Sequence, residues 1–153
     1  MKKKGILFGA LCLVMLFLVT GCGNKKAITT SDFKSKAEKA GYQTADVYNQ
    51  YKEFGYVKEA TVATKDGYQV EFYVLDNKSN AAGMFNTNKT TFENTKSGSA
   101  TESSVELGNY STYSLTSSDS YMYLSRVDNT LIYVKVPESA KDNVKSLIKE
   151  LGY

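Results

Sequence analysis

The chain has 153 residues, with 19 basic and 16 acidic side chains, two Cys, and neither His nor Trp. Without His and with so few Cys, the sequence excludes the usual zinc ligand sets and the Ser-His and Cys-His nucleophile pairs. We therefore expect no metal centre and no cofactor.

The N-terminus has a basic start and a short apolar stretch. Lysines at positions 2–4 precede an apolar run over residues 6–19, which closes on Val19-Thr20-Gly21-Cys22. This arrangement is typical of an export signal, and the run is shorter than the about 20 apolar residues of a membrane-spanning helix. The four closing residues resemble the lipobox of bacterial lipoproteins. The resemblance implies that residues 1–21 are removed and that Cys22 carries a lipid at the extracytoplasmic face of the cell membrane. A plain secretory signal, the alternative, would leave Cys22 as an ordinary thiol.

Removal of residues 1–21 takes away three lysines and leaves 16 basic side chains against 16 acidic ones. This balance favours neither nucleic acid nor a polybasic membrane patch. The remaining chain of about 130 residues is long enough for one core. We assign residues 22–29 to the lipidated Cys and a tether, and residues 30–153 to a single domain. With Cys22 acylated, no disulfide is available, so the core alone must stabilise this domain.

The domain begins with a predicted helix of about ten residues, for which Thr30 and Ser31 are good N-caps. Phe33 and Ala37 share its apolar face. The next segment, 42–55, has partly helical spacing, and two interpretations stay open: an irregular link or one further helical turn.

A β-hairpin is predicted over residues 57–75, around Lys65-Asp66-Gly67. A three-residue loop with Gly in the left-handed position is a common hairpin connection. This loop pairs Val62 with Val70 and gathers apolar residues on one face. A two-residue loop would pair Val62 with Glu71 and mix the faces, so the longer loop is expected.

A second helix is predicted over residues 79–95, where apolar side chains recur at helical spacing. The Ser- and Thr-rich stretch 96–104 is expected to be a loop. An irregular strand follows over residues 105–115, with a bulge or bend at Gly108-Asn109.

Residues 121–127 and 130–136 are predicted to be strands, with side chains on alternating faces. Asp128-Asn129 between them predicts a tight hairpin turn. The final helix is expected to start with a capping box formed by Ser139 and Asp142 and to end at Gly152. The order α-β-β-α-β-β-β-α predicts an α+β domain with an antiparallel sheet of about five strands. We expect its helices to pack mainly on one face.

One face of the last hairpin is less polar than a solvated surface, and Tyr73 of the first hairpin lies near it in the expected sheet. We interpret this face as an exposed patch for a protein or peptide partner, in which Arg126 contacts a carboxylate. The alternative is that the first helix or segment 42–55 covers it. The candidate residues are Met122, Leu124, Arg126, Leu131, Tyr133 and Tyr73.

No catalytic residues are predicted. Two Ser-x-x-Lys pairs lack the companion motifs of Ser-Lys acylases, and the acidic residues are scattered singly among lysines. We therefore expect a lipid-anchored, non-enzymatic module that binds a protein, a peptide or a cell-envelope component, with no nucleic-acid partner. The alternatives are a small-molecule receptor with a pocket between sheet and helices, and a hydrolase that works without His.

Overall fold

The structure is a computed structural model in which residues 24–153 are described, so the predicted export signal and Cys22 lie outside the described residues. The helices are α1 (Thr30–Lys39), α2 (Lys78–Glu93) and α3 (Lys141–Leu151), with 3-10 turns η1 (Tyr48–Gln50) and η2 (Glu138–Ala140). The strands are β1 (Gln43–Asp46), β2 (Val57–Lys65), β3 (Tyr68–Leu75), β4 (Thr101–Leu107), β5 (Tyr110–Ser117), β6 (Ser120–Val127) and β7 (Thr130–Pro137).

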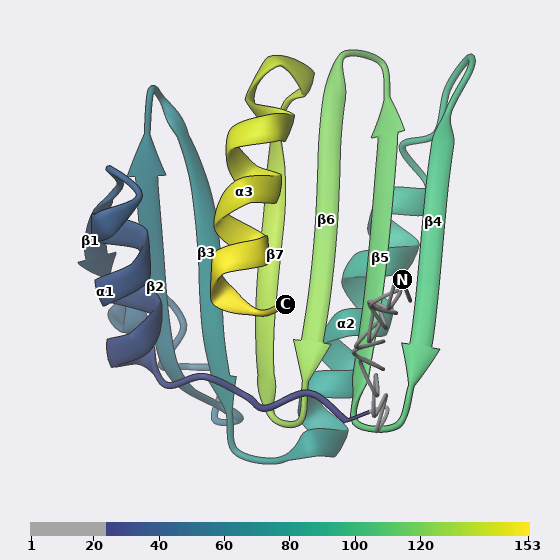
Figure 1. Cartoon of the computed structure of the whole chain (residues 1–153). Helices are drawn as coiled ribbons and strands as arrows, with labels where there is room; N and C mark the ends of the chain where they lie inside the picture. The colour runs from purple at the N-terminus through teal and green to yellow at the C-terminus, as the bar shows by residue number, and fades with distance from the viewer. Residues whose placement is uncertain (1–23) are drawn as a thin grey trace, which may run out of the picture.

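The seven strands of the described chain pair antiparallel in one sheet, in the order β1-β2-β3-β7-β6-β5-β4. Figure 1 shows α1 and α3 on the near face of this sheet and α2 behind it. The α+β class and the antiparallel sheet are confirmed. The expectation of about five strands is wrong, because β1 was not recognised and the single strand expected over residues 105–115 is two strands, β4 and β5. The expectation that the helices pack mainly on one face is also wrong, since α2 covers the opposite face.

Helix α1 begins next to a complete capping box, one residue earlier than predicted. The Thr29 hydroxyl accepts a hydrogen bond from the Asp32 amide at 3.1 Å, and the Asp32 carboxylate accepts one from the Thr29 amide at 3.1 Å. Phe33 and Ala37 are buried, as expected. Segment 42–55 contains the edge strand β1 followed by η1. The further helical turn had been considered for this segment, whereas a strand had not.

The first hairpin has a two-residue turn, and the predicted three-residue loop is wrong. Asp66 and Gly67 have φ values of 49° and 81°, which fits the turn type that matches the twist of hairpin strands. Ala63 consequently pairs with Val70, and Val62 pairs with Glu71. Mixing apolar residues between the faces carries no penalty here, because both faces of the sheet are covered.

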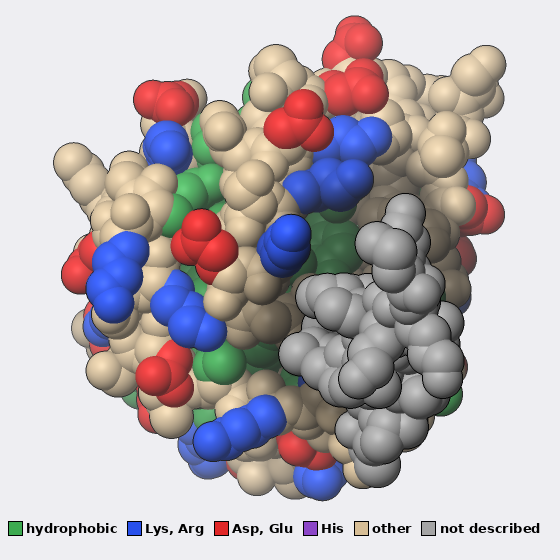
Figure 2. Space-filling model, in the orientation of Figure 1, with side chains coloured by type: hydrophobic (Ala, Val, Ile, Leu, Met, Phe, Trp, Pro, Cys, Tyr) green, Lys and Arg blue, Asp and Glu red, His purple; other side chains and the backbone are tan. Residues whose placement is uncertain are grey.

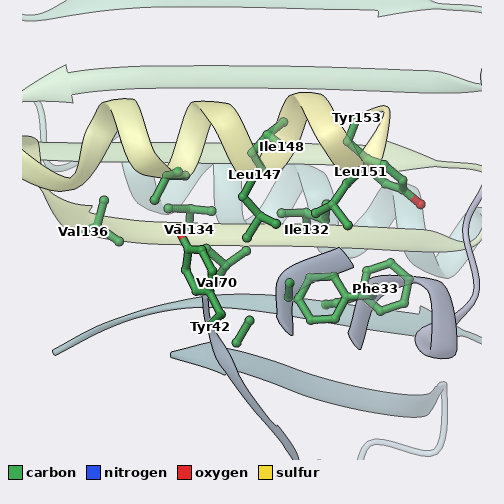
Figure 3. Packing of buried hydrophobic residues seen from close by; sticks show 14 of the residues in the cluster. Phe33, Tyr42, Val70, Ile132, Val134, Val136, Leu147, Ile148, Leu151 and Tyr153 are labelled. Carbon is green, nitrogen blue, oxygen red and sulfur yellow. The ribbon is translucent and has the colours of Figure 1, made fainter. Parts of the chain in front are cut away.

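The first core lies between the sheet and the pair α1 and α3 (Figure 3). Phe33 of α1 stacks on Phe72 of β3 with ring centroids 4.9 Å apart. Tyr153 packs edge-on against the same Phe72 ring. The predicted apolar stripe of the last helix is confirmed by its buried members, Val144, Leu147, Ile148 and Leu151.

The second core lies between the opposite face of the sheet and α2. Asn77 caps α2 by accepting a hydrogen bond from the Asn80 amide at 2.9 Å. The helix exists close to its predicted range, but it faces away from α3. The buried residues of this second core include Phe85 and Phe92 of α2 and, from the sheet, Val57, Tyr73, Leu75, Tyr113, Leu115, Met122, Leu124 and Leu131.

The second half of the sheet contains two hairpins. Gly108-Asn109 connects β4 to β5 as a turn rather than a bulge, and β4 starts at Thr101, inside the stretch expected to be a loop. Asp128-Asn129 forms the predicted turn between β6 and β7. The capping box expected from Ser139 and Asp142 is wrong, because η2 precedes α3 and Ala140 occupies the N-cap without a side-chain bond.

Residues that were assigned to a tether lie against the domain. The Lys25 amide donates to the Asn109 side chain at 2.9 Å, and the Asn109 amide nitrogen donates back to the Lys25 carbonyl at 2.7 Å. Ala27 and Ile28 pack against the first core. The chain before α1 is therefore held on the sheet from Lys25 onward.

Candidate functional site

The residues predicted to form an exposed patch are covered. Met122, Leu124, Leu131 and Tyr73 are each at most 3% exposed and belong to the second core. Their predicted exposure is wrong, because the apolar face of α2 packs on them. The expected cover from segment 42–55 is present in part, since Tyr51 also packs against this core.

The remaining two members of the predicted patch, Arg126 and Tyr133, make contacts inside the domain. The Arg126 guanidinium donates to the Ser111 hydroxyl at 3.0 Å and to the Asn109 carbonyl at 3.4 Å. Tyr133 is half-buried, and its ring lies 5.1 Å from that of Phe92. Arg126 thus stabilises the turns at one end of the sheet, and its guanidinium makes hydrogen bonds within the domain.

A groove opens beside the second core, between α2 and the segment that follows η1. Its volume is about 370 Å³. Phe54 is 50% exposed and Tyr56 is 39% exposed, and their rings lie 5.9 Å apart at its mouth. We call this cavity the α2 groove; it is lined by Tyr51, Phe54, Tyr56, Val57, Asn80, Gly83, Met84, Thr87 and Asn88.

Successive tight turns build the aromatic wall of the α2 groove. The Phe54 amide donates to the Tyr51 carbonyl at 2.9 Å, and the Val57 amide donates to the Phe54 carbonyl at 2.9 Å. The Asp76 amide donates to the Tyr56 carbonyl at 2.9 Å, which ties this wall to the chain just before α2. The exposed rings are therefore presented by a hydrogen-bonded backbone.

Tyr73 holds the inner part of the same wall. Its ring meets that of Tyr51 edge-on with centroids 5.1 Å apart, and the two hydroxyl oxygens are hydrogen-bonded at 2.9 Å. The Tyr73 hydroxyl also donates to the Glu71 carboxylate. Burial, reinforced by the nearby Glu71 charge, raises the pKa of Tyr73 far above its usual value. The hydroxyl thus remains a neutral donor, and its role is to position Tyr51.

Helix α2 forms the other wall, and a glycine lies at its centre. A Cβ placed on Gly83 would meet no atom within 4 Å. Asn80 donates its side-chain nitrogen to Asp76 at 2.7 Å, and Asn88 donates its own to the Met84 carbonyl at 2.8 Å. These bonds use the amide nitrogens and leave the amide oxygens as acceptors for a bound chain.

The α2 groove contains apolar and amide groups rather than charged ones. Among the described residues, no group of three or more His, Cys, Asp or Glu side chains could hold a metal ion. None of the described helices has the length and apolar character needed to cross a bilayer. The lining is suited to burying apolar side chains and accepting hydrogen bonds from a backbone.

Comparisons with protein-family models, with curated proteins and with solved structures find no match to this chain. The groove residues were not predicted from the sequence. Two signals were visible: aromatic residues at positions 51, 54 and 56 without strand alternation, and Gly83 inside a predicted helix.

Proposed function

We propose that this chain is a lipid-anchored, non-catalytic binding domain at the extracytoplasmic face of the cell membrane. Its lipid is on Cys22, and its partner is a protein whose apolar side chains enter the α2 groove. The lipobox resemblance supports the anchor, and the chemistry of the groove supports the partner.

The observation that carries the binding role is Gly83. A glycine inside a helix costs about 1 kcal/mol relative to Ala. Gly83 has no close neighbour that would exclude a Cβ, so packing within the domain does not require it. A larger side chain at this position would project into the α2 groove and fill it. The sequence thus keeps a destabilising residue where a bound group needs space.

The exposed aromatic rings of the α2 groove, more than its volume, favour a protein over a small molecule. A volume of about 370 Å³ lies near the lower end of small-molecule pockets, which span roughly 300–1,000 Å³. Exposed aromatic rings beside a pocket are typical of the anchor points of protein interfaces. The Asn80 and Asn88 oxygens can accept hydrogen bonds from the partner's backbone.

The anchor is tested by Cys22→Ala in cells. We expect the protein to leave the membrane fraction or to keep residues 1–21, and the intact mass of the wild type to show a lipid on Cys22. Unchanged fractionation and processing of the variant would refute the anchor.

The groove is tested by in-cell photo-crosslinking, with a benzophenone side chain in place of Phe54 and a control probe at the exposed Gln69. We expect one protein product from Phe54 alone. Gly83→Phe should abolish this product, whereas Asn86→Phe should preserve it, because Asn86 is exposed on α2 outside the groove.

Two other outcomes would contradict the proposed partner. A product that survives Gly83→Phe would show that the α2 groove is not the site. A small adduct on the probe, without a protein product, would favour the small-molecule receptor.

A further inference from the structure

A hollow with lysines around it opens beside α3, on the face of the sheet opposite the α2 groove. Its volume is about 400 Å³. Figure 2 shows it as a green-floored depression bordered by blue side chains. We call it the basic hollow; it is lined by Lys25, Tyr121, Tyr123, Lys145, Ile148, Lys149, Gly152 and Tyr153.

The floor of the basic hollow is aromatic and uncharged. Tyr121 and Tyr123 stack with ring centroids 6.4 Å apart and an interplanar angle of 22°. Burial raises the pKa of Tyr121 to about 12, so its hydroxyl stays neutral. Tyrosine, with an apolar ring and a polar tip, is favoured where an apolar phase meets water.

The charges at the rim of the basic hollow are of one sign. Lys145 and Lys149 lie one turn apart on α3, and Lys25 faces them from the N-terminal segment. Lys141, one turn earlier, places its ammonium 5.4 Å from the Tyr121 ring centre. The lining includes no acidic residue. A second hollow shares Lys25 and Gly152 with the basic hollow and is also lined by an acid, Asp32. The Asp32 carboxylate is held in the capping box of α1. This rim therefore complements an anion.

Exposed apolar side chains continue the same face onto β4. Leu107 is 49% exposed and Val105 is 44% exposed. Leu107 pairs with Tyr110, which pairs with Val127 of the first core, so Leu107 and Val105 point to the α3 side. The alternation of the strand directs the β4 acids, Glu102 and Glu106, to the other side.

The N-terminal segment places this face close to Cys22. Lys25 is fixed to the turn between β4 and β5 by its hydrogen bonds with Asn109. Lys25 is three positions after Cys22 in the sequence, and three extended residue steps span at most about 10 Å. A lipid on Cys22 would hold the basic hollow within this distance of the membrane surface.

We propose that the face containing the basic hollow rests on anionic phospholipid headgroups. This inference relies on the proposed lipid at Cys22 for its geometry. The lysines bind headgroup phosphates, the partly buried Tyr123 lies at the interface, and Val105 and Leu107 reach the acyl boundary. The α2 groove, on the opposite side of the sheet, is thereby turned away from the membrane toward a partner.

The test is lysine footprinting of the full-length protein, purified from membranes and placed in nanodiscs. One preparation contains phosphatidylcholine alone, and the other also contains phosphatidylglycerol. Acetylation of each lysine is read by mass spectrometry. We expect acetylation of Lys145 and Lys149 to fall about threefold to fivefold with the anionic lipid, in line with the attraction of a single lysine to an anionic surface. Lys52, beside the α2 groove, should not change.

Equal acetylation in both nanodiscs would overturn the inference. Equal protection by inorganic phosphate in phosphatidylcholine nanodiscs would also overturn it, because the hollow would then be a site for soluble anions. K145Q/K149Q should remove the remaining protection of Lys25, and retention of that protection would contradict the proposed surface.

The mass of the N-terminal peptide distinguishes this inference from the proposed anchor. An unmodified Cys22 with protected lysines would refute the anchor and retain the headgroup contact. A lipidated Cys22 with unprotected lysines would refute the headgroup contact alone.

Discussion

Tyr51 and Tyr73 meet edge to face, with ring centroids 5.1 Å apart and hydroxyl oxygens hydrogen-bonded at 2.9 Å. This pair links the segment between η1 and β2 to strand β3 of the sheet. Tyr73 lies 3% exposed in the second core, while Tyr51 lines the α2 groove. The shape of the groove therefore depends on the hydroxyl of a residue that is buried in the second core.

Tyr73→Phe should loosen this wall. The change removes the donor to Glu71 and the partner of Tyr51 while keeping the ring, so we expect a loss of about 1–2 kcal/mol in the free energy of unfolding. Hydrogen exchange in residues 48–56 should accelerate at the same time. Tyr56→Phe, at an exposed position, is the matched control and should change stability by less than about 0.5 kcal/mol. Equal effects of the two variants would show that the hydroxyl network does not hold the wall.

Phe72→Ala should be among the most damaging changes in the chain. Phe72 is fully buried and is contacted by the rings of Phe33 and Tyr153. Removal of a buried Phe side chain costs about 3–5 kcal/mol. Denaturant titration measures this loss, with Phe54→Ala as the exposed counterpart. A loss below about 1 kcal/mol for Phe72→Ala would contradict its place in the first core.

Elements with a clear hydrophobic period could be predicted from the sequence, and the edges of the sheet could not. The hairpin around Asp128-Asn129 and the last helix were found because their apolar residues recur at a fixed spacing. β4 is exposed along its whole length, so little alternation marks it. β1 has only four residues, and none of them is buried.

The register of the first hairpin was wrong for a different reason. The predicted register was based on one covered face, which disfavours a pairing that divides apolar residues between two faces. The positions of Ala60 in the second core and Ala63 in the first core show that both faces are buried. The same assumption led to the expectation that the Leu124 face would be exposed.

The two candidate sites depend on tertiary proximity. Phe54 and Gly83 line one groove although 29 positions separate them in the sequence. Lys25 and Lys149 line one hollow from opposite ends of the domain. A balanced charge count cannot reveal such a local cluster, because acids elsewhere cancel it in the sum.

Asp128→Asn tests whether Asp128 stabilises the fold through its ion pair with Lys78 or through its turn conformation. The Asp128 carboxylate lies 2.6 Å from the Lys78 ammonium, and hydrogen bonding to Lys78 lowers the pKa of Asp128 below its ordinary 3.8. Asn keeps the left-handed turn conformation that Asp128 adopts at a φ of 51°. Because Lys78 is largely exposed, we expect a loss of at most about 1 kcal/mol at neutral pH.

The sign of the pH dependence follows from the lowered pKa. The native state binds fewer protons than the unfolded state, so the stabilisation is complete above the ordinary pKa and disappears as the pH falls through the native one. Unfolding free energies of the wild type and Asp128→Asn should therefore differ at neutral pH and converge once the pH falls below the native pKa of Asp128. A difference that does not change with pH would assign the effect to the turn.

One substitution at two glycines should have opposite effects on stability. A Cβ on Gly67 or on Gly83 would meet no atom within 4 Å, so steric contact cannot explain a difference between the two variants. Gly67 has a φ of 81°, where an L side chain costs about 1–2 kcal/mol, so Gly67→Ala should destabilise the fold. Gly83 lies inside α2, where Ala is favoured, so Gly83→Ala should raise the free energy of unfolding by about 0.5–1 kcal/mol. Loss of stability in both variants would show that Gly83 is needed by the fold itself, and would remove the argument that it keeps the α2 groove open for a partner.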